Sequence, residues 1–155
     1  MIRDWLVSVL AGFKKFLFRD PKPLPKFDPQ DRIEEEHLLE LINEERVRNG
    51  MLPLEEVHEL SITAKESARR NYQFNDCTNK PDGMILQMRL LRKEYAADLC
   101  GELVNKGAKT VKDCFYSWTM DPKSAGVLKN GYFCHVGIGK CGHFWTAIFT
   151  RPRIF

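Results

Sequence analysis

The sequence lacks three features that would each indicate a particular class of protein. None of its five cysteines forms a CxxC pair or a metal-finger spacing, which argues against a structural zinc site. The apolar stretch over residues 5–13 is far shorter than the roughly 20 residues that a helical membrane span needs. An excess of basic charge on the main part of the chain is also missing.

The net positive charge is confined to the N-terminal segment. Six of the 24 Lys and Arg residues and three of the 21 Asp and Glu residues lie in residues 1–30, which leaves 18 of each sign elsewhere. A neutral domain has no basic footprint of the kind that nucleic-acid-binding proteins carry. We therefore expect no nucleic-acid partner.

Residues 1–19 are predicted to form an amphipathic helix. Apolar side chains recur at helical spacing and form a stripe that includes Trp5, Leu6, Val9, Phe13 and Phe16. We expect this stripe to bind a protein partner or the domain's own flank, with a membrane surface as the alternative. The prolines of residues 20–30 predict a semi-rigid linker between this helix and a domain over residues 31–155.

The domain is predicted to mix helices and strands. Asp28 followed by Pro29 predicts the start of a helix that ends near Gly50, with Leu38, Leu41 and Ile42 buried. The charged residues of this helix are expected in solvent: Glu34, Glu35, Glu36, Glu44 and Arg48. Further helices are predicted over 55–72, 84–95 and 110–118, a strand over 98–104, and a hairpin of 132–138 with 143–150. This order of elements indicates an α+β domain.

Two cysteines support opposite predictions. Cys114 lies on a helix face with Val111, Phe115 and Trp118, so we expect it to be a small buried hydrophobe. Cys141 lies in the predicted hairpin turn, where an exposed thiol would be available for an intermolecular disulfide.

Several motifs occur in a characteristic order along the chain: LLELINEERVRNGMLPL over residues 38–54, Gly101-Glu102-Leu103, Trp118 to Pro122, Val136-Gly137-Ile138-Gly139, and Phe144-Trp145. In order and spacing, residues 31–151 resemble the CAP superfamily, also called the SCP-like domain, in its short bacterial or phage form. The resemblance implies a three-layer α-β-α sandwich. It implies less about activity, because function belongs to a site and not to a fold.

The resemblance also implies where a site would lie. In CAP proteins with a complete site, two histidines and two acidic residues face one cleft and can hold zinc. Matched one at a time, the histidine positions carry Cys77 and Ser124, and the acidic positions carry Glu102 and Asp121. Loss of both imidazoles removes the side chains that titrate near neutral pH and bind zinc as neutral ligands. We therefore expect a degenerate cleft of these four residues, with no catalytic residue, no metal and no cofactor.

These observations favour a non-catalytic structural or binding module that its N-terminal helix anchors to a larger assembly. No secretion signal is recognised in a domain type that is usually exported, so we expect a place outside the cell or in a particle such as a virion. One alternative is a membrane-surface or lipid-binding protein. Another is a cysteine-dependent hydrolase, with Cys77 as nucleophile and His135 or His143 as base.

Overall fold

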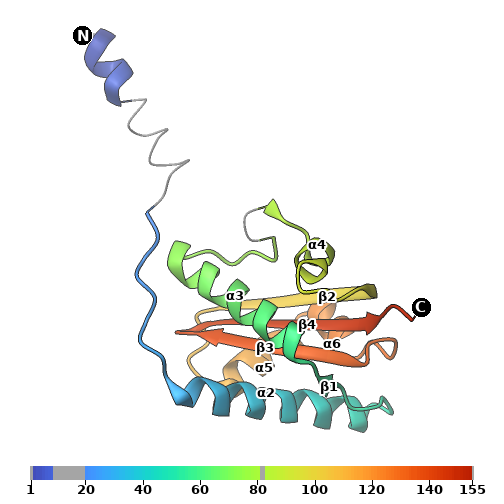
Figure 1. Ribbon diagram of the computed structural model, residues 1–155. Helices are drawn as coiled ribbons and strands as arrows, with labels where there is room; N and C mark the ends of the chain where they lie inside the picture. Colours follow the sequence, from blue (N-terminus) through green and yellow to red (C-terminus); the bar gives the residue numbers. More distant parts are fainter. Residues whose placement is uncertain (1, 9–19, 81–82, 155) are drawn as a thin grey trace.

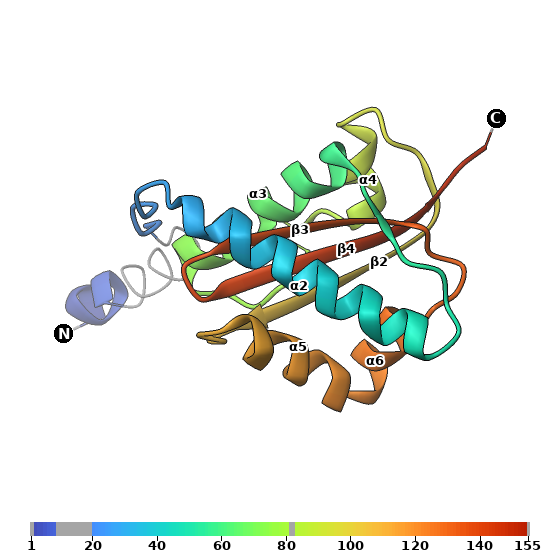
Figure 2. The same cartoon turned by 90° about the horizontal axis from the view of Figure 1, so that it is seen from below.

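A four-stranded sheet forms the middle layer of the domain (Figure 1). The computed structural model describes residues 2–8, 20–80 and 83–154. The strand order is β1-β3-β4-β2, with β1 parallel to β3 and the other neighbours antiparallel. Helices α2, α5 and α6 cover one face and α3 and α4 cover the other, as Figures 1 and 2 show together. The predicted α+β class and three-layer sandwich are thus confirmed.

The helices and strands have the following bounds in chain order: α2 Pro29–Arg48, β1 Glu55–Glu56, α3 His58–Phe74, α4 Leu86–Leu91, β2 Ala97–Lys106, α5 Val111–Met120, α6 Pro122–Leu128, β3 His135–Cys141 and β4 Phe144–Pro152. Helix α3 begins later than predicted because Glu55 and Glu56 pair with β3 instead. Helix α4 is shorter than predicted, and α6 was not predicted.

Residues 2–8 are helical, and Trp5 and Leu6 are exposed on them. The other three residues of the predicted stripe, Val9, Phe13 and Phe16, lie outside the described residues. Within the part of the chain that the structure describes, no helix has both the length and the apolar character that crossing a membrane requires.

Helix α2 begins as the sequence predicts. The Asp28 carboxylate accepts a hydrogen bond from the backbone N–H of Gln30 at 2.9 Å, and Pro29 occupies the first helical turn, where a missing N–H costs nothing. Beyond Arg48, Gly50 takes a φ of 79°, which ends the helix. Leu38 and Ile42 are buried as predicted, and Leu41 is half-buried.

The prediction that Glu35 is solvated is wrong. Glu35 is buried where α2 meets β3, and its Oε1 accepts from the Lys140 backbone N–H at 3.0 Å and from Lys65 Nζ at 3.2 Å. Burial raises the pKa of Glu35, and the charge of Lys65 opposes the rise. Arg46 is also buried, and its guanidinium donates to four carbonyl oxygens at 2.9–3.1 Å, those of Leu52, Leu128, Asn130 and Phe133. It thereby ties the end of α2 to two loops.

The β3–β4 hairpin extends further than its predicted arms. Its turn lies at Gly142 and His143, so Cys141 is a strand residue paired with Phe144 and is buried. The prediction of an exposed turn cysteine is therefore wrong, because Cys141 is a buried strand residue. The intermolecular disulfide stays a prediction. Gly137 and Gly139 face α3, and a Cβ on either would lie 2.1–2.3 Å from its backbone. Helix α3 consequently lies directly on β3.

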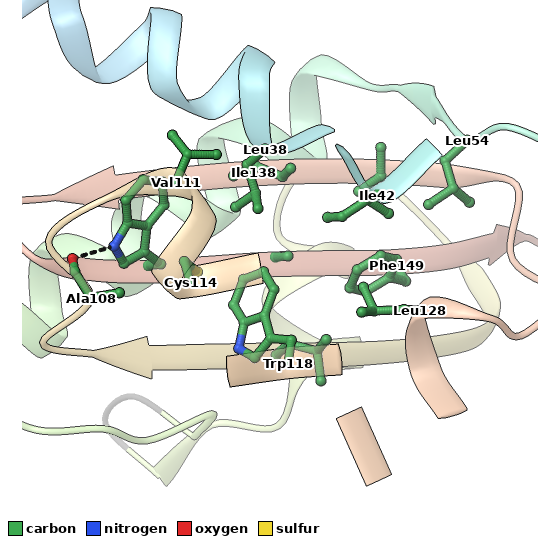
Figure 3. Close-up of a cluster of buried hydrophobic side chains, with 14 of the residues drawn as sticks. Leu38, Ile42, Leu54, Ala108, Val111, Cys114, Trp118, Leu128, Ile138 and Phe149 are labelled. Atoms are coloured by element: carbon green, nitrogen blue, oxygen red, sulfur yellow. Dashed lines mark hydrogen bonds between the residues drawn. The ribbon is translucent and has the colours of Figure 1, made fainter. Parts of the chain in front are cut away.

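Two hydrophobic clusters fill the spaces between the layers. The larger, shown in Figure 3, lies between the sheet and helices α2, α5 and α6, and includes Trp118 and the fully buried Cys114. The predicted role of Cys114 as a small buried hydrophobe is confirmed. The smaller cluster lies under α3 and α4 and includes Leu60, Leu90 and Ile148. These clusters fix which face of the sheet each strand residue occupies.

Candidate functional site

Glu102 lies on the face of the sheet that α3 and α4 cover. Strand residues alternate between faces, so Leu103 joins the larger cluster while Cys100 and Glu102 point the other way. Only 2% of the Glu102 side chain is exposed. Its Oε1 accepts from Ser67 Oγ on α3 at 3.0 Å, and Arg89 on α4 forms an ion pair with its Oε2.

Arg89 and Ser67 were missed by the sequence reasoning, although their positions carry a signal. Ser67 falls at helical spacing from the inward-facing Leu60 and Ala64, and Arg89 follows Leu86 by three residues. A polar side chain on an inward helix face needs a buried partner, because an unpaired one is costly. The acidic residue of a neighbouring strand is such a partner.

The electrostatic environment of Glu102 is set by opposing effects. Burial raises the pKa of its carboxyl to about 7, while the charge of Arg89 and the Ser67 hydrogen bond act to lower it. Both oxygens accept hydrogen bonds from protein groups, and only 2% of the side chain is exposed. An incoming ion would therefore have to displace Arg89 or Ser67 to reach the carboxyl.

Asp121 and Ser124 lie together, but on the other side of the sheet. The exposed Asp121 caps α6, its Oδ2 accepting from the Ser124 backbone N–H at 3.0 Å and from Ser124 Oγ at 2.8 Å. These hydrogen bonds hold the pKa of Asp121 below its ordinary value. Helix α6 belongs to the layer opposite α3 and α4, so the sheet separates this pair from Glu102.

Cys77 occupies a third place, in the segment after α3. The residue is exposed, yet desolvation of the thiol raises its pKa, and the charge of Lys106 at the end of β2 opposes that rise. His135 is engaged elsewhere, with its Nδ1 2.9 Å from the Tyr95 hydroxyl, and His143 is exposed in the β3–β4 turn. Among the described residues, no hydrogen bond joins Cys77 to either histidine.

The structure does not bring Cys77, Glu102, Asp121 and Ser124 into one cleft. The residues present also do not fit the zinc ion that the resemblance implies for complete sites. Glu102 is ion-paired with Arg89, and Asp121 is a helix cap. Among residues 2–8, 20–80 and 83–154, no group of three His, Cys, Asp or Glu side chains could hold a metal ion.

A cavity of about 380 Å³ lies between α3 and α4, with Ser67 and Arg89 among its walls. It is lined by Leu24, Thr63, Glu66, Ser67, Arg69, Arg70, Gln73, Met84, Arg89, Arg92 and Lys93. The buried pair of Glu102 and Arg89 therefore underlies a hollow that opens on the α3–α4 side. The prediction placed the cleft by motif alone and did not find this cavity.

Comparison with known proteins gives a consistent fold. No protein-family model and no curated protein matches the chain. Among solved structures, an outer surface protein from Borrelia burgdorferi superposes with a TM-score of 0.78 at 18% identity, over 84% of this chain and 100% of its own. An extracellular protein containing an SCP domain from Bacillus anthracis str. Ames gives 0.76 at 19% identity, over 82% of this chain and 45% of its own. The chain has the CAP, or SCP-like, fold.

A third CAP-fold neighbour is a cysteine-rich secretory protein from Staphylococcus aureus subsp. aureus Mu50, with a TM-score of 0.67 at 20% identity, over 83% of this chain and 41% of its own. The chain thus spans less than half the length of the Bacillus and Staphylococcus chains. Each of these neighbours is described as extracellular, outer-surface or secretory. At this level of identity the likeness establishes the CAP fold alone.

Proposed function

We propose that this CAP-fold chain is a non-catalytic structural or binding module. The observation that carries the proposal is that the buried Glu102 carboxylate is already bound by Arg89, through an ion pair, and by Ser67, through a hydrogen bond. A general base needs a lone pair that substrate can reach, and a metal ligand needs an oxygen free to coordinate. Glu102, the only deeply buried acid of the predicted set, has both oxygens hydrogen-bonded to protein groups and only 2% of its side chain exposed, so neither is within reach of a substrate or an ion unless Arg89 or Ser67 moves.

The remaining members of the set support the same proposal. The Asp121 carboxylate caps the first turn of α6, where it accepts hydrogen bonds from the backbone N–H and the hydroxyl of Ser124. Cys77 and Ser124 stand where the resemblance places imidazoles. The acids of the family's cleft are therefore used here to hold the fold together.

The N-terminal segment provides the attachment in this proposal. Trp5 and Leu6 are exposed on the helix of residues 2–8, and large apolar patches on soluble proteins mark interaction sites. The linker meets the domain at the end of α3, where the Lys22 backbone N–H donates to the Gln73 carbonyl oxygen at 2.8 Å and Lys22 Nζ lies 4.9 Å from the centre of the Tyr72 ring. We propose a larger assembly outside the cell, such as a virion or a cell surface, as the body to which this segment attaches.

Zinc retention tests the non-catalytic part of the proposal. The full chain is dialysed against zinc, desalted, and analysed for metal, and its melting temperature is measured with and without a chelator. We expect less than stoichiometric metal and no chelator effect, because no ion stabilises the folded state. Stoichiometric zinc that is lost in Glu102→Gln and retained in the exposed-residue variant Glu36→Gln would overturn the proposal.

A further inference from the structure

The cavity between α3 and α4 has the size of a small-molecule site. Its volume of about 380 Å³ falls in the range of pockets that enclose organic ligands. Helix α3 forms one wall, α4 and the residues after it form another, and Leu24 of the linker contributes an apolar side chain. Met84 adds a second apolar surface.

Positive charge dominates the cavity walls. Among the described lining residues, five are cationic, Arg69, Arg70, Arg89, Arg92 and Lys93, against a single acid, Glu66. Lys93 Nζ lies 2.7 Å from Glu66 Oε1, so that acid is already neutralised. Arg89 is paired with Glu102 beneath the cavity. Arg69 and Arg92 are left without a lining acid to balance them.

The excess of positive charge in the cavity walls is clearest at Arg69 and Arg92. Neither forms an ion pair with a residue that the structure describes, and they come from different sides of the cavity, one from α3 and one from the end of α4. Arg70 lies with its guanidinium carbon 3.4 Å from the centre of the Phe74 ring, which holds it in place. Arg69 and Arg92 are exposed, and like charges gathered around a concave space produce a field that attracts an ion of opposite sign.

Guanidinium groups also determine which anion fits. Their planar forks match the oxygens of phosphate and carboxylate groups, and two forks from opposite walls suit an anion that carries two charges. The amide of Gln73 offers a further donor in the wall, and Leu24 and Met84 offer contact to an apolar part of the ligand.

We propose that this cavity binds a small organic phosphate, with the phosphate between Arg69 and Arg92 and an apolar portion against Leu24 and Met84. This site is separate from the attachment through the N-terminal helix, and it requires no reaction. The same phosphate group occurs in soluble esters and in phospholipid headgroups, so the test distinguishes these two sources.

Isothermal titration calorimetry on the full chain at fixed salt tests the site. The probes are inorganic phosphate, glycerol 3-phosphate and dihexanoyl phosphatidic acid, and vesicles of phosphatidylcholine with phosphatidic acid are tested by co-sedimentation. The site variant is Arg69→Gln with Arg92→Gln. The matched control is Lys123→Gln with Lys129→Gln, which removes the same charge from exposed positions on and beside α6, on the opposite face.

We expect at least one organic phosphate to bind, with affinity reduced at least about tenfold in the site variant, because each hydrogen bond to a charged group contributes more than a neutral one. The control should bind as the wild type does. Binding of glycerol 3-phosphate identifies a soluble ester, whereas binding confined to the short-chain lipid or to vesicles, and lost in the site variant, identifies a lipid headgroup. Absence of binding by every probe, or an equal loss in the control, would overturn the proposal.

Discussion

Arg89 of α4 and Glu102 of β2 form an ion pair beneath the α3–α4 cavity, with 10% and 2% of their side chains exposed. The two residues come from different elements, and the pair connects the short helix α4 to the sheet. A buried pair of this kind is costly to break from one side only, because the remaining charge keeps no partner.

The first prediction concerns this pair. Arg89→Met should lower the free energy of unfolding by about 3 kcal/mol or more at pH 8, where the lone Glu102 carboxylate must stay charged or take up a proton against the solution pH. Urea unfolding monitored by circular dichroism measures the loss. Replacing both partners, Arg89→Met with Glu102→Leu, should recover most of the stability. A double variant as unstable as the single one would show that the pair's geometry, and not its charge, holds α4 in place.

The second prediction is a dependence of stability on pH. Burial raises the pKa of Glu102 from 4.5 to about 7, so between these values the folded chain holds a proton that the unfolded chain releases. The contribution of Glu102 to stability is therefore greatest below pH 4.5 and declines as pH rises to 7. We expect the unfolding free energy of the wild type minus that of Glu102→Gln to fall over this window. If this difference instead rose between pH 4.5 and 7, the charge of Arg89 would outweigh burial in setting the pKa of Glu102.

The third prediction uses the backbone at Glu94. This exposed residue follows α4 with a φ of 58°, a left-handed conformation that costs a side-chain-bearing residue about 1 kcal/mol and glycine very little. Glu94→Gly should therefore raise the free energy of unfolding by about 0.5–1 kcal/mol. The same change at Glu44, exposed within α2, should instead cost about 1 kcal/mol. If both variants lose stability, the conformation at Glu94 is not the strained one.

The fourth prediction tests the separation of the motif residues. Cys77 lies in the segment after α3, and Ser124 lies on α6, in the layer opposite α3. Cys77→His combined with Ser124→His should therefore not create a metal site beside Glu102, although two imidazoles and a carboxylate are a known zinc ligand set. Cobalt added to the folded double variant should keep the weak visible spectrum of the hydrated ion. Strong absorption would require the two segments to meet.

The fifth prediction concerns the N-terminal helix. Deletion of residues 1–19 should leave a folded monomer with an unchanged melting temperature, whereas the full chain should associate through its exposed apolar residues, as measured by sedimentation velocity. Trp5→Ser with Leu6→Ser in the full chain should weaken that association. An unfolded or aggregated deletion variant would place the helix in the domain core and contradict the linker interpretation.

Local signals allowed several elements to be predicted from the sequence. The start of α2 follows from the chemistry of Asp28 and Pro29 alone, and the alternation around Gly142 is visible within the hairpin. Asp121 and Pro122 carry the same signal as Asp28 and Pro29, and they start α6. The prediction assigned these residues to a motif of the site, so the helix was missed although its signal was present.

Other features depended on which elements meet. Glu35 and Arg46 lie at helical spacing from Leu38 and Ile42 and so share the buried face of α2, but the partners that let charged side chains be buried there come from other elements. The pairing of Arg89 with Glu102 likewise depends on how α4 packs against β2. The motifs identified the acid but not its partner, which decides whether the acid can act.

Gly137 and Gly139 set a condition on how the α3–α4 cavity can change its width. Because the backbone of α3 rests on β3 with no room for even a methyl group between them, α3 cannot move closer to the sheet. The opposite wall is less extensively packed, since α4 has only six residues and is joined to the sheet by Arg89. The α3 wall of the cavity is therefore the more tightly packed one, and we expect a change in the width of the cavity to come from movement of α4.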